Sequence, residues 1–174
     1  EKFLRQPLHP HQLQWWDLLE GREPRDLHPA QTYSPADSDR ILINVPPEHA
    51  KTTTLTMNYV TWRICCNPNV RILIVSKTRE MAKKMLFGVK QRLTHPAYRE
   101  MQLAFAPEGG WKATADAWTT DMIYIGGESR NSGEKDPTVQ ALGIRGHIYG
   151  ARADLIIIDD GIDGSNAHEF EKQI

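Results

Sequence analysis

Apolar residues gather along the chain in short runs that predict strands rather than helices. The clearest runs are residues 40–45, 70–75, 122–125 and 155–158. Each is rich in β-branched residues, is bounded by polar or turn-forming residues and is too short for a helix. Three of them are almost continuously apolar, which is typical of the central strands of a parallel sheet that is covered on both faces.

A second pattern, with apolar residues three or four positions apart, predicts helices. Helices are expected over residues 8–19, 53–66 and 78–93, and Asn67-Pro68-Asn69 is expected to end the second one. Strands and helices thus alternate with short connections. This alternation predicts an α/β fold built from right-handed βαβ units, with a mainly parallel central sheet flanked by helices.

Three segments interrupt the alternation. Residues 22–39 are rich in Pro, Asp and Ser and predict a loop, and residues 104–120 predict a loop with a short irregular strand. Residues 126–150 are rich in Gly, Ser and charge, and we expect a long functional or mobile loop there. One domain is predicted, with residues 1–39 as an N-terminal helix and loop and residues 40–174 as the core. Because no closing element follows the last apolar run, we expect a fragment of a longer protein.

Composition narrows the class of protein without indicating its activity. The chain has 174 residues, of which 40% are hydrophobic and 25% charged, and its formal net charge is −1. These values favour one globular domain and exclude a disordered tail, a collagen-like repeat and a coiled coil. No apolar run approaches the roughly 18 residues of a membrane span. The two cysteines, Cys65 and Cys66, are too few for a disulfide framework or a zinc site and fit a reducing cytosol.

The segment after the first predicted strand has features of a phosphate-binding loop. Residues 46–53 read Pro-Pro-Glu-His-Ala-Lys-Thr-Thr and lead into a predicted helix. In such loops, helix N–H groups and a lysine bind the phosphates, and a hydroxyl binds Mg²⁺. Lys51 and Thr52 occupy those two positions, but Val45 and Ala50 stand where the pattern requires glycines. A Pro-containing turn with a Thr-rich helix cap and a solvated Lys51 is the alternative.

The last apolar run supplies the second half of a nucleotide site. It reads Leu-Ile-Ile-Ile-Asp-Asp over residues 155–160. Carboxylates at the carboxyl end of a buried strand lie where open α/β sheets bind ligands. We expect Asp159 to hold Mg²⁺ opposite the Thr52 hydroxyl, and Asp160 to orient the attacking water as a general base. The alternative is a solvated turn that continues into Gly161.

Taken in order, these segments resemble the ATPase domain of large terminase subunits, the DNA-packaging motors of tailed bacteriophages. Residues 46–52 resemble the family's Walker A loop, residues 143–160 its glycine-rich segment and Walker B strand, and residues 74–82 its second strand and helix entry. His11-Gln12 resembles its adenine-recognition motif. Glu48 and Ala50 depart from the arginine and glycine often found in the loop, and Asp160 replaces a frequent glutamate.

The resemblance implies a three-layer P-loop NTPase fold of the additional-strand, RecA-like type. It further implies ATP hydrolysis, with Mg²⁺, that drives viral double-stranded DNA into a procapsid. The implied partners are DNA, a homo-oligomeric ring, the portal protein and the small terminase subunit, in the host cytoplasm and without a membrane. The family's nuclease domain has no counterpart in these residues. The implied ATP-binding residues are Gln12, Pro47, Glu48, His49, Ala50, Lys51, Thr52 and Thr53.

The resemblance to terminase ATPase domains also implies roles for individual residues. The catalytic set is Lys51, Asp160 and an arginine finger, for which Arg145 ranks before Arg152 and Arg130. Gln12 is expected to read the adenine edge, with Gln14 as the alternative. The basic residues between 77 and 99 are either the solvated face of a helix or a DNA-facing surface.

Two other functions stay open. A helicase-like ATPase would have a similar adenine motif and second-strand entry. A degenerate nucleotide-binding module that does not hydrolyse ATP would account for Glu48 and for the absent loop glycine.

Overall fold

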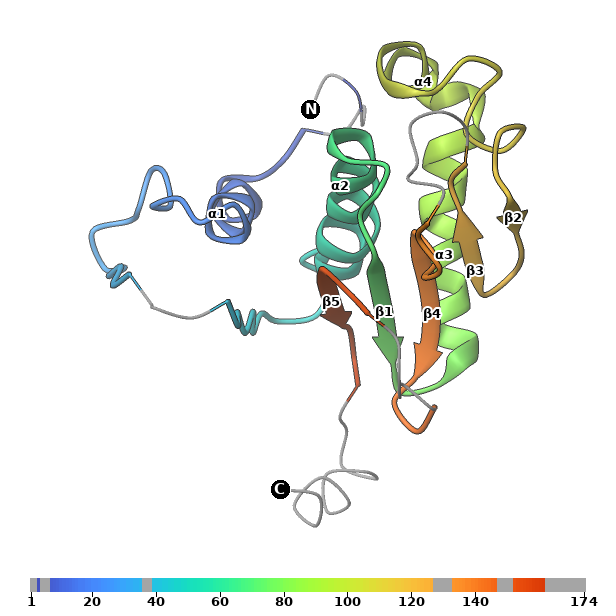
Figure 1. The fold of residues 1–174 in the computed structure, drawn as a ribbon. Helices are drawn as coiled ribbons and strands as arrows, with labels where there is room; N and C mark the ends of the chain where they lie inside the picture. Colours follow the sequence, from blue (N-terminus) through green and yellow to red (C-terminus); the bar gives the residue numbers. More distant parts are fainter. Residues whose placement is uncertain (1–2, 4–6, 36–38, 127–132, 147–151, 162–174) are drawn as a thin grey trace.

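The chain forms a mixed α/β structure around an open five-stranded sheet (Figure 1). The computed structural model describes residues 3, 7–35, 39–126, 133–146 and 152–161. The strands are β1 (Ile72–Ser76), β2 (Ala117–Trp118), β3 (Met122–Tyr124), β4 (Val139–Gly143) and β5 (Leu155–Ile158), in the order β2-β3-β4-β1-β5. β4, β1 and β5 are parallel, whereas β2 and β3 join the sheet antiparallel. The predicted α/β class with a parallel centre is therefore confirmed.

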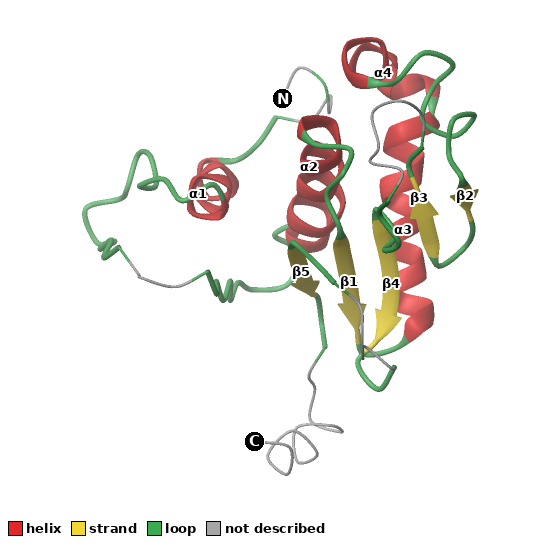
Figure 2. Cartoon of the chain, in the orientation of Figure 1, coloured by secondary structure: helices red, strands yellow, loops and turns green. Residues whose placement is uncertain are grey.

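The three helices that the sequence predicts are present, and two short helices that it did not predict follow the third (Figure 2). They are α1 (Pro10–Leu19), η1 (Thr52–Tyr59), α2 (Val60–Cys66), α3 (Arg79–Thr94), η2 (Pro96–Tyr98) and α4 (Arg99–Phe105). The helix predicted over residues 53–66 exists, but its first half, η1, is a π-helix and only α2 is α-helical. Such wide turns are rare and frequently lie at functional sites.

The main core lies between the sheet and the helices α2 and α3, which are neighbours on one face (Figure 1). Ile72 and Ile74 of β1 face this layer, together with Leu86 and Val89 of α3. The alternate residues Leu73 and Val75 point to the opposite face, as the period of two in a strand requires. In the described ranges no helix covers that opposite face. The described residues therefore supply two of the three predicted layers, the sheet and the helices on one of its faces.

Two sequence predictions are wrong. Residues 40–45 form no strand: they lack regular structure, and Leu42 is 93% exposed. An apolar run becomes a strand only when a neighbouring strand accepts its backbone hydrogen bonds, and none of the described strands pairs with this run. Conversely, residues 126–150 are not one long loop, because they contain β4, which lies between β3 and β1.

Parallel pairing brings the carboxyl ends of β4, β1 and β5 to one edge of the sheet. Val75 of β1 lies opposite both Leu142 of β4 and Ile158 of β5. The residues that follow these strands therefore lie near one another, although they are far apart in the sequence. No helix in the described ranges is long and apolar enough to cross a membrane.

Candidate functional site

At this edge of the sheet, Lys51 meets the two carboxylates that follow β5. Lys51 Nζ lies 3.2 Å from Asp160 Oδ1 and 3.6 Å from Asp159 Oδ1. Lys51 caps the amino end of η1, while the carboxylates are more than a hundred residues further along the chain. The structure thus joins the two segments that the sequence singled out separately.

Asp159 is the buried member of this cluster. Its side chain is 3% exposed, and its Oδ2 accepts a 2.7 Å hydrogen bond from the Thr56 hydroxyl. Its Oδ1 is buried without a hydrogen bond, because Lys51 Nζ lies just beyond hydrogen-bonding distance. A buried carboxylate oxygen needs compensation, which the described residues supply to Oδ1 only through the ion pair with Lys51, so Oδ1 is the oxygen that a bound cation would take.

Thr56 is the site residue that the sequence analysis missed. The sequence predicts Thr52 opposite Asp159, but Thr56, four residues further along η1, makes the contact. The sequence carried no signal for Thr56, because only the fold shows which face of η1 meets Asp159. Thr52 and Thr53 are half-buried in the first turn of η1.

The loop before η1 is exposed and has an unusual backbone. Glu48 and Ala50 have positive φ angles of 67° and 54°, where glycine is the residue adopted without strain. The His49 ring nitrogen Nδ1 lies 2.9 Å from the carbonyl oxygen of Pro47 and closes the turn. The loop therefore has the left-handed conformation at Ala50, where the phosphate-loop pattern places a glycine.

The charges around Lys51 keep this lysine protonated. Partial burial opposes the charged form, but the hydrogen bond from Lys51 to Asp160 and the nearby charge of Asp159 outweigh it, so the pKa of Lys51 is raised. Asp160 is more exposed than Asp159, with 60% of its side chain accessible, and its φ angle is also positive, at 49°. The cluster therefore offers a permanent positive charge beside an accessible carboxylate.

Gln12 connects α1 to the loop. Its Nε2 donates a 3.3 Å hydrogen bond to the carbonyl oxygen of His49, and its Oε1 accepts one of 3.0 Å from the backbone N–H of His9. Gln14, the alternative adenine reader, donates instead to the carbonyl oxygens of Arg25 and Asp26. Of the two, Gln12 is the one held beside the predicted phosphate loop, and its role in reading adenine stays a prediction.

A cavity of about 490 Å³ adjoins the Lys51 cluster. Its walls come from residues 41–43, from η1 and from β5, and Lys51, Thr56 and Asp159 are part of its lining. Ile41 and Leu42 on one wall and Ile156 and Ile158 on another are exposed apolar side chains. The cluster is therefore accessible from a partly apolar cavity.

The predicted arginine fingers lie at different places in the fold. Arg145 follows β4 and lines a second cavity, also of about 490 Å³, together with Lys77, Thr78 and Arg79. Arg152 precedes the amino end of β5, so it lies toward the opposite edge of the sheet from Asp159. Arg130 lies outside the described residues. Arg152 therefore lies away from Lys51, whereas Arg145 follows β4 at the same edge of the sheet as Asp160, and its role as the arginine finger stays a prediction.

The basic stretch between residues 77 and 99 does not form one uniform surface. Arg92 is buried at 7% exposure and its guanidinium donates to Asn58. Lys90 donates to the carbonyl oxygen of Thr119, while Lys84 is exposed. The interpretation as a solvated helix face therefore holds for only some of these residues.

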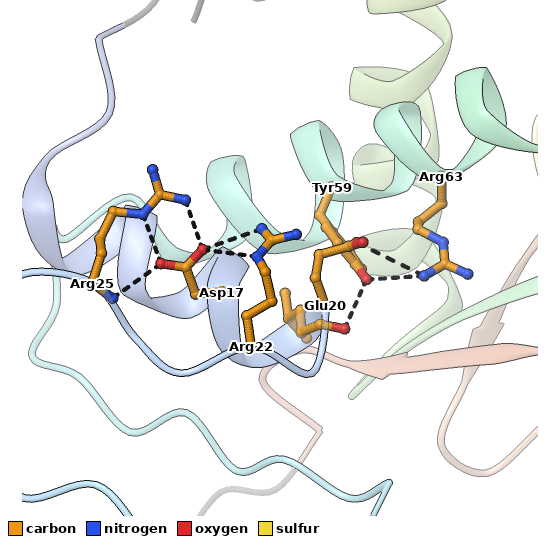
Figure 3. Close-up of polar contacts among 7 residues, drawn as sticks. Asp17, Glu20, Arg22, Arg25, Tyr59 and Arg63 are labelled. Atoms are coloured by element: carbon orange, nitrogen blue, oxygen red, sulfur yellow. Dashed lines mark hydrogen bonds and ion pairs between the residues drawn. The ribbon is translucent and has the colours of Figure 1, made fainter.

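A second buried carboxylate, Asp17 of α1, has a very different surrounding (Figure 3). Asp17 accepts hydrogen bonds from the side chains of Arg22 and Arg25 and from the backbone N–H of Arg25. Nearby, Arg63 donates to the Tyr59 hydroxyl, which donates to the carbonyl oxygen of Leu19. The contacts of Asp17 hold the loop that follows α1 in place, and the contact of Tyr59 with Leu19 attaches the end of α1 to η1.

The site residues fit a Mg²⁺ ion. Two hard oxygen donors of the kind that Mg²⁺ takes are present: the Thr52 hydroxyl, and Asp159 Oδ1, which forms an ion pair with Lys51 but no hydrogen bond. In the part of the chain that is described, no three His, Cys, Asp or Glu side chains converge on a metal position. Nucleotide-bound Mg²⁺ needs only one or two protein oxygens, since phosphates and water complete its shell.

Comparison with known proteins adds no family assignment. No protein-family model matches the chain, and no curated protein matches its sequence.

Proposed function

We propose that this chain is a P-loop ATPase, and that it is the ATPase domain of a phage large terminase that translocates double-stranded DNA. One observation carries the ATPase proposal: Lys51, at the amino end of η1, lies within 3.2 Å of Asp160 and 3.6 Å of Asp159 at the carboxyl edge of the sheet. The terminase assignment rests in addition on the order of the sequence segments.

In the proposed reaction, the side chains have separate tasks. Lys51 exchanges its carboxylate partners for the β and γ phosphates of ATP and neutralises their charge. Asp160 accepts a hydrogen bond from the water whose oxygen bonds to the γ phosphorus, while the bond from that phosphorus to the bridging oxygen breaks. Asp159 and Thr52 would hold Mg²⁺, which when bound supplies positive charge to the phosphate oxygens.

Lys51→Ala and Asp160→Asn test the proposal. Each is expected to lower the ATP turnover rate by at least about a hundredfold, because each removes a group that acts on the reacting phosphate or water. Phosphate release from ATP at saturating Mg²⁺ is the measurement. Lys112→Ala, which removes an exposed lysine distant in sequence from the loop, is the control and should retain full turnover. Equal turnover in the unmodified chain and in all three variants would reject the proposed active site.

Binding distinguishes hydrolysis from the non-hydrolysing alternative. The positive φ angles of Glu48 and Ala50 are the observation that favours a degenerate module, because non-glycine residues are strained there. If the chain binds a fluorescent ATP analogue, loses that binding in Lys51→Ala and releases no phosphate, it is a nucleotide-binding module. Turnover that depends on both Lys51 and Asp160 rejects that alternative.

DNA packaging is tested separately from hydrolysis. The terminase assignment predicts that double-stranded DNA binds with an affinity that falls steeply with salt, because contacts to the backbone release counterions. A titration of a labelled duplex at several salt concentrations measures this. An active ATPase whose DNA affinity is absent or insensitive to salt would retain the ATPase proposal and reject the DNA-translocating one.

A further inference from the structure

Thr56 holds one oxygen of the Asp159 carboxylate and leaves the other available. Its hydroxyl donates to Asp159 Oδ2 at 2.7 Å, and both side chains are buried, with Thr56 at 1% exposure. A short hydrogen bond to a charged acceptor in a buried setting is strong and directional. Among the described contacts, Thr56 forms the hydrogen bond to Oδ2 and Lys51 forms an ion pair with Oδ1, so the Thr56 hydroxyl fixes which oxygen is turned away from Lys51.

The other oxygen, Oδ1, faces Lys51. Lys51 Nζ lies 3.6 Å from it, and it is buried without a hydrogen bond. The neighbouring strand contributes another such group. Ser76 follows Val75, the partner of Ile158, so Ser76 lies beside Asp159 on the same face of the sheet. The Ser76 hydroxyl is buried at 0% exposure and also has no hydrogen-bond partner.

We infer that Thr56 is a positioning residue for the cation of this site: it turns the Asp159 carboxylate so that Oδ1 faces the bound Mg²⁺. The inference rests on the proposed ATP-binding function and adds to it a residue that binds neither nucleotide nor metal. Groups that orient a metal ligand affect metal affinity strongly, and their removal typically lowers that affinity about 10- to 100-fold. Without the Thr56 hydroxyl, the ion pair with Lys51 would be the remaining described contact of the carboxylate, so either oxygen would be able to face Lys51.

The test compares Thr56→Val with Thr56→Ser. Valine has nearly the shape of threonine but lacks the hydroxyl, whereas serine retains the hydroxyl and lacks the methyl group. The measurement is the Mg²⁺ concentration that gives half-maximal binding of a fluorescent ATP analogue, which requires no turnover. We expect Thr56→Val to raise this concentration about tenfold or more, and Thr56→Ser to restore it to within about threefold of the unmodified chain.

Thr61→Val is the matched control. Thr61 is also buried, at 0% exposure, but its hydroxyl donates to the carbonyl oxygen of Met57 and not to a site residue. It should therefore leave the Mg²⁺ requirement unchanged. Thermal unfolding of each variant checks folding, and Thr56→Ala, with the same expected rise, replaces Thr56→Val if the valine variant does not fold.

Each outcome decides the inference. An unchanged Mg²⁺ requirement in Thr56→Val overturns the inference. So does a rise in Thr61→Val as large as the rise in Thr56→Val. A loss of analogue binding in Thr56→Val that is equally large without Mg²⁺ also overturns it. In those cases the proposed ATPase stands if Lys51→Ala still abolishes analogue binding. An unmodified chain that never binds the analogue refutes the proposed function and, with it, this inference.

Discussion

Two buried carboxylates, Asp17 and Asp159, have almost the same exposure and very different surroundings. Both side chains are 3% exposed. Asp17 has all its hydrogen-bonding capacity used by Arg22 and Arg25, whereas Asp159 has one oxygen bonded to Thr56 and one oxygen with no hydrogen bond. A carboxylate satisfied within the protein stabilises the fold, while one left incomplete in a cavity is prepared for a ligand.

Replacing each of the two aspartates by asparagine should separate these roles, and the largest effect is expected at Asp159. Asp159→Asn removes the charge that would hold Mg²⁺, so ATP turnover should fall by about a hundredfold or more. Its free energy of unfolding should change by less than about 1 kcal/mol, because the only hydrogen bond there is one that an amide oxygen also accepts. Phosphate release and urea denaturation measure the two quantities, and a stability loss above 2 kcal/mol would contradict the assignment.

Asp17→Asn should have the converse effect. It leaves the guanidinium groups of Arg22 and Arg25 facing an amide that donates as well as accepts, so the free energy of unfolding should fall by about 2 to 3 kcal/mol. Asp116→Asn, at an exposed carboxylate, is the control and should be neutral. Urea denaturation of both variants measures the free energy of unfolding. If Asp17→Asn proves as stable as the control, Asp17 does not stabilise the loop that follows α1.

Acid should weaken the contribution of Asp17. Its hydrogen bonds from Arg25 hold the pKa of the Asp17 carboxyl far below the usual value, although burial opposes this. A carboxyl with a lowered pKa stabilises the fold above its unfolded pKa of about 4, and this stabilisation is lost as the pH falls below that value. The stability difference between the unmodified chain and Asp17→Asn should therefore be about 1 kcal/mol smaller at pH 3 than at pH 6. A difference that does not vary with pH would show that Asp17 is not the titrating group.

The smallest predicted effect is at Ala50, in the loop of the candidate site. Its φ angle of 54° is unfavourable for a residue with a Cβ, so Ala50→Gly should raise the free energy of unfolding by about 0.5 to 1 kcal/mol. Ala104→Gly, in the helix α4, should lower it by a similar amount, because glycine weakens helices. Thermal unfolding of both variants provides the measurement, and a destabilised Ala50→Gly would exclude strain at this position.

Local patterns in the sequence predicted the helices well and the sheet only in part. The apolar spacing of α3 and the position of Asp159 at a strand end are properties of short segments, and the structure agrees with both. β4 is different: Val139–Gly143 includes a glutamine, lies in a glycine-rich and charged segment and is stabilised as a strand by β1 and β3, which are far from it in sequence. Residues 40–45 show the reverse, since they have a strong strand pattern but pair with none of the described strands.

In the candidate site, too, the residues identified by a local motif were predictable, and those identified only by long-range contacts were not. Lys51, Asp159 and Asp160 were predictable because each belongs to a motif with its own local chemistry. Thr56 was not singled out, because only the fold shows which face of η1 meets Asp159.

The position of β5 affects how the protein behaves at high concentration. In the described sheet β5 is the outermost strand, and Ile156 and Ile158 on it are 56% and 60% exposed. A strand edge with no partner, in a segment of four consecutive aliphatic residues, is a template for pairing with a second chain. Purified material should therefore self-associate through this edge as its concentration rises, and a charged residue at Ile156 is the substitution best suited to keep it monodisperse.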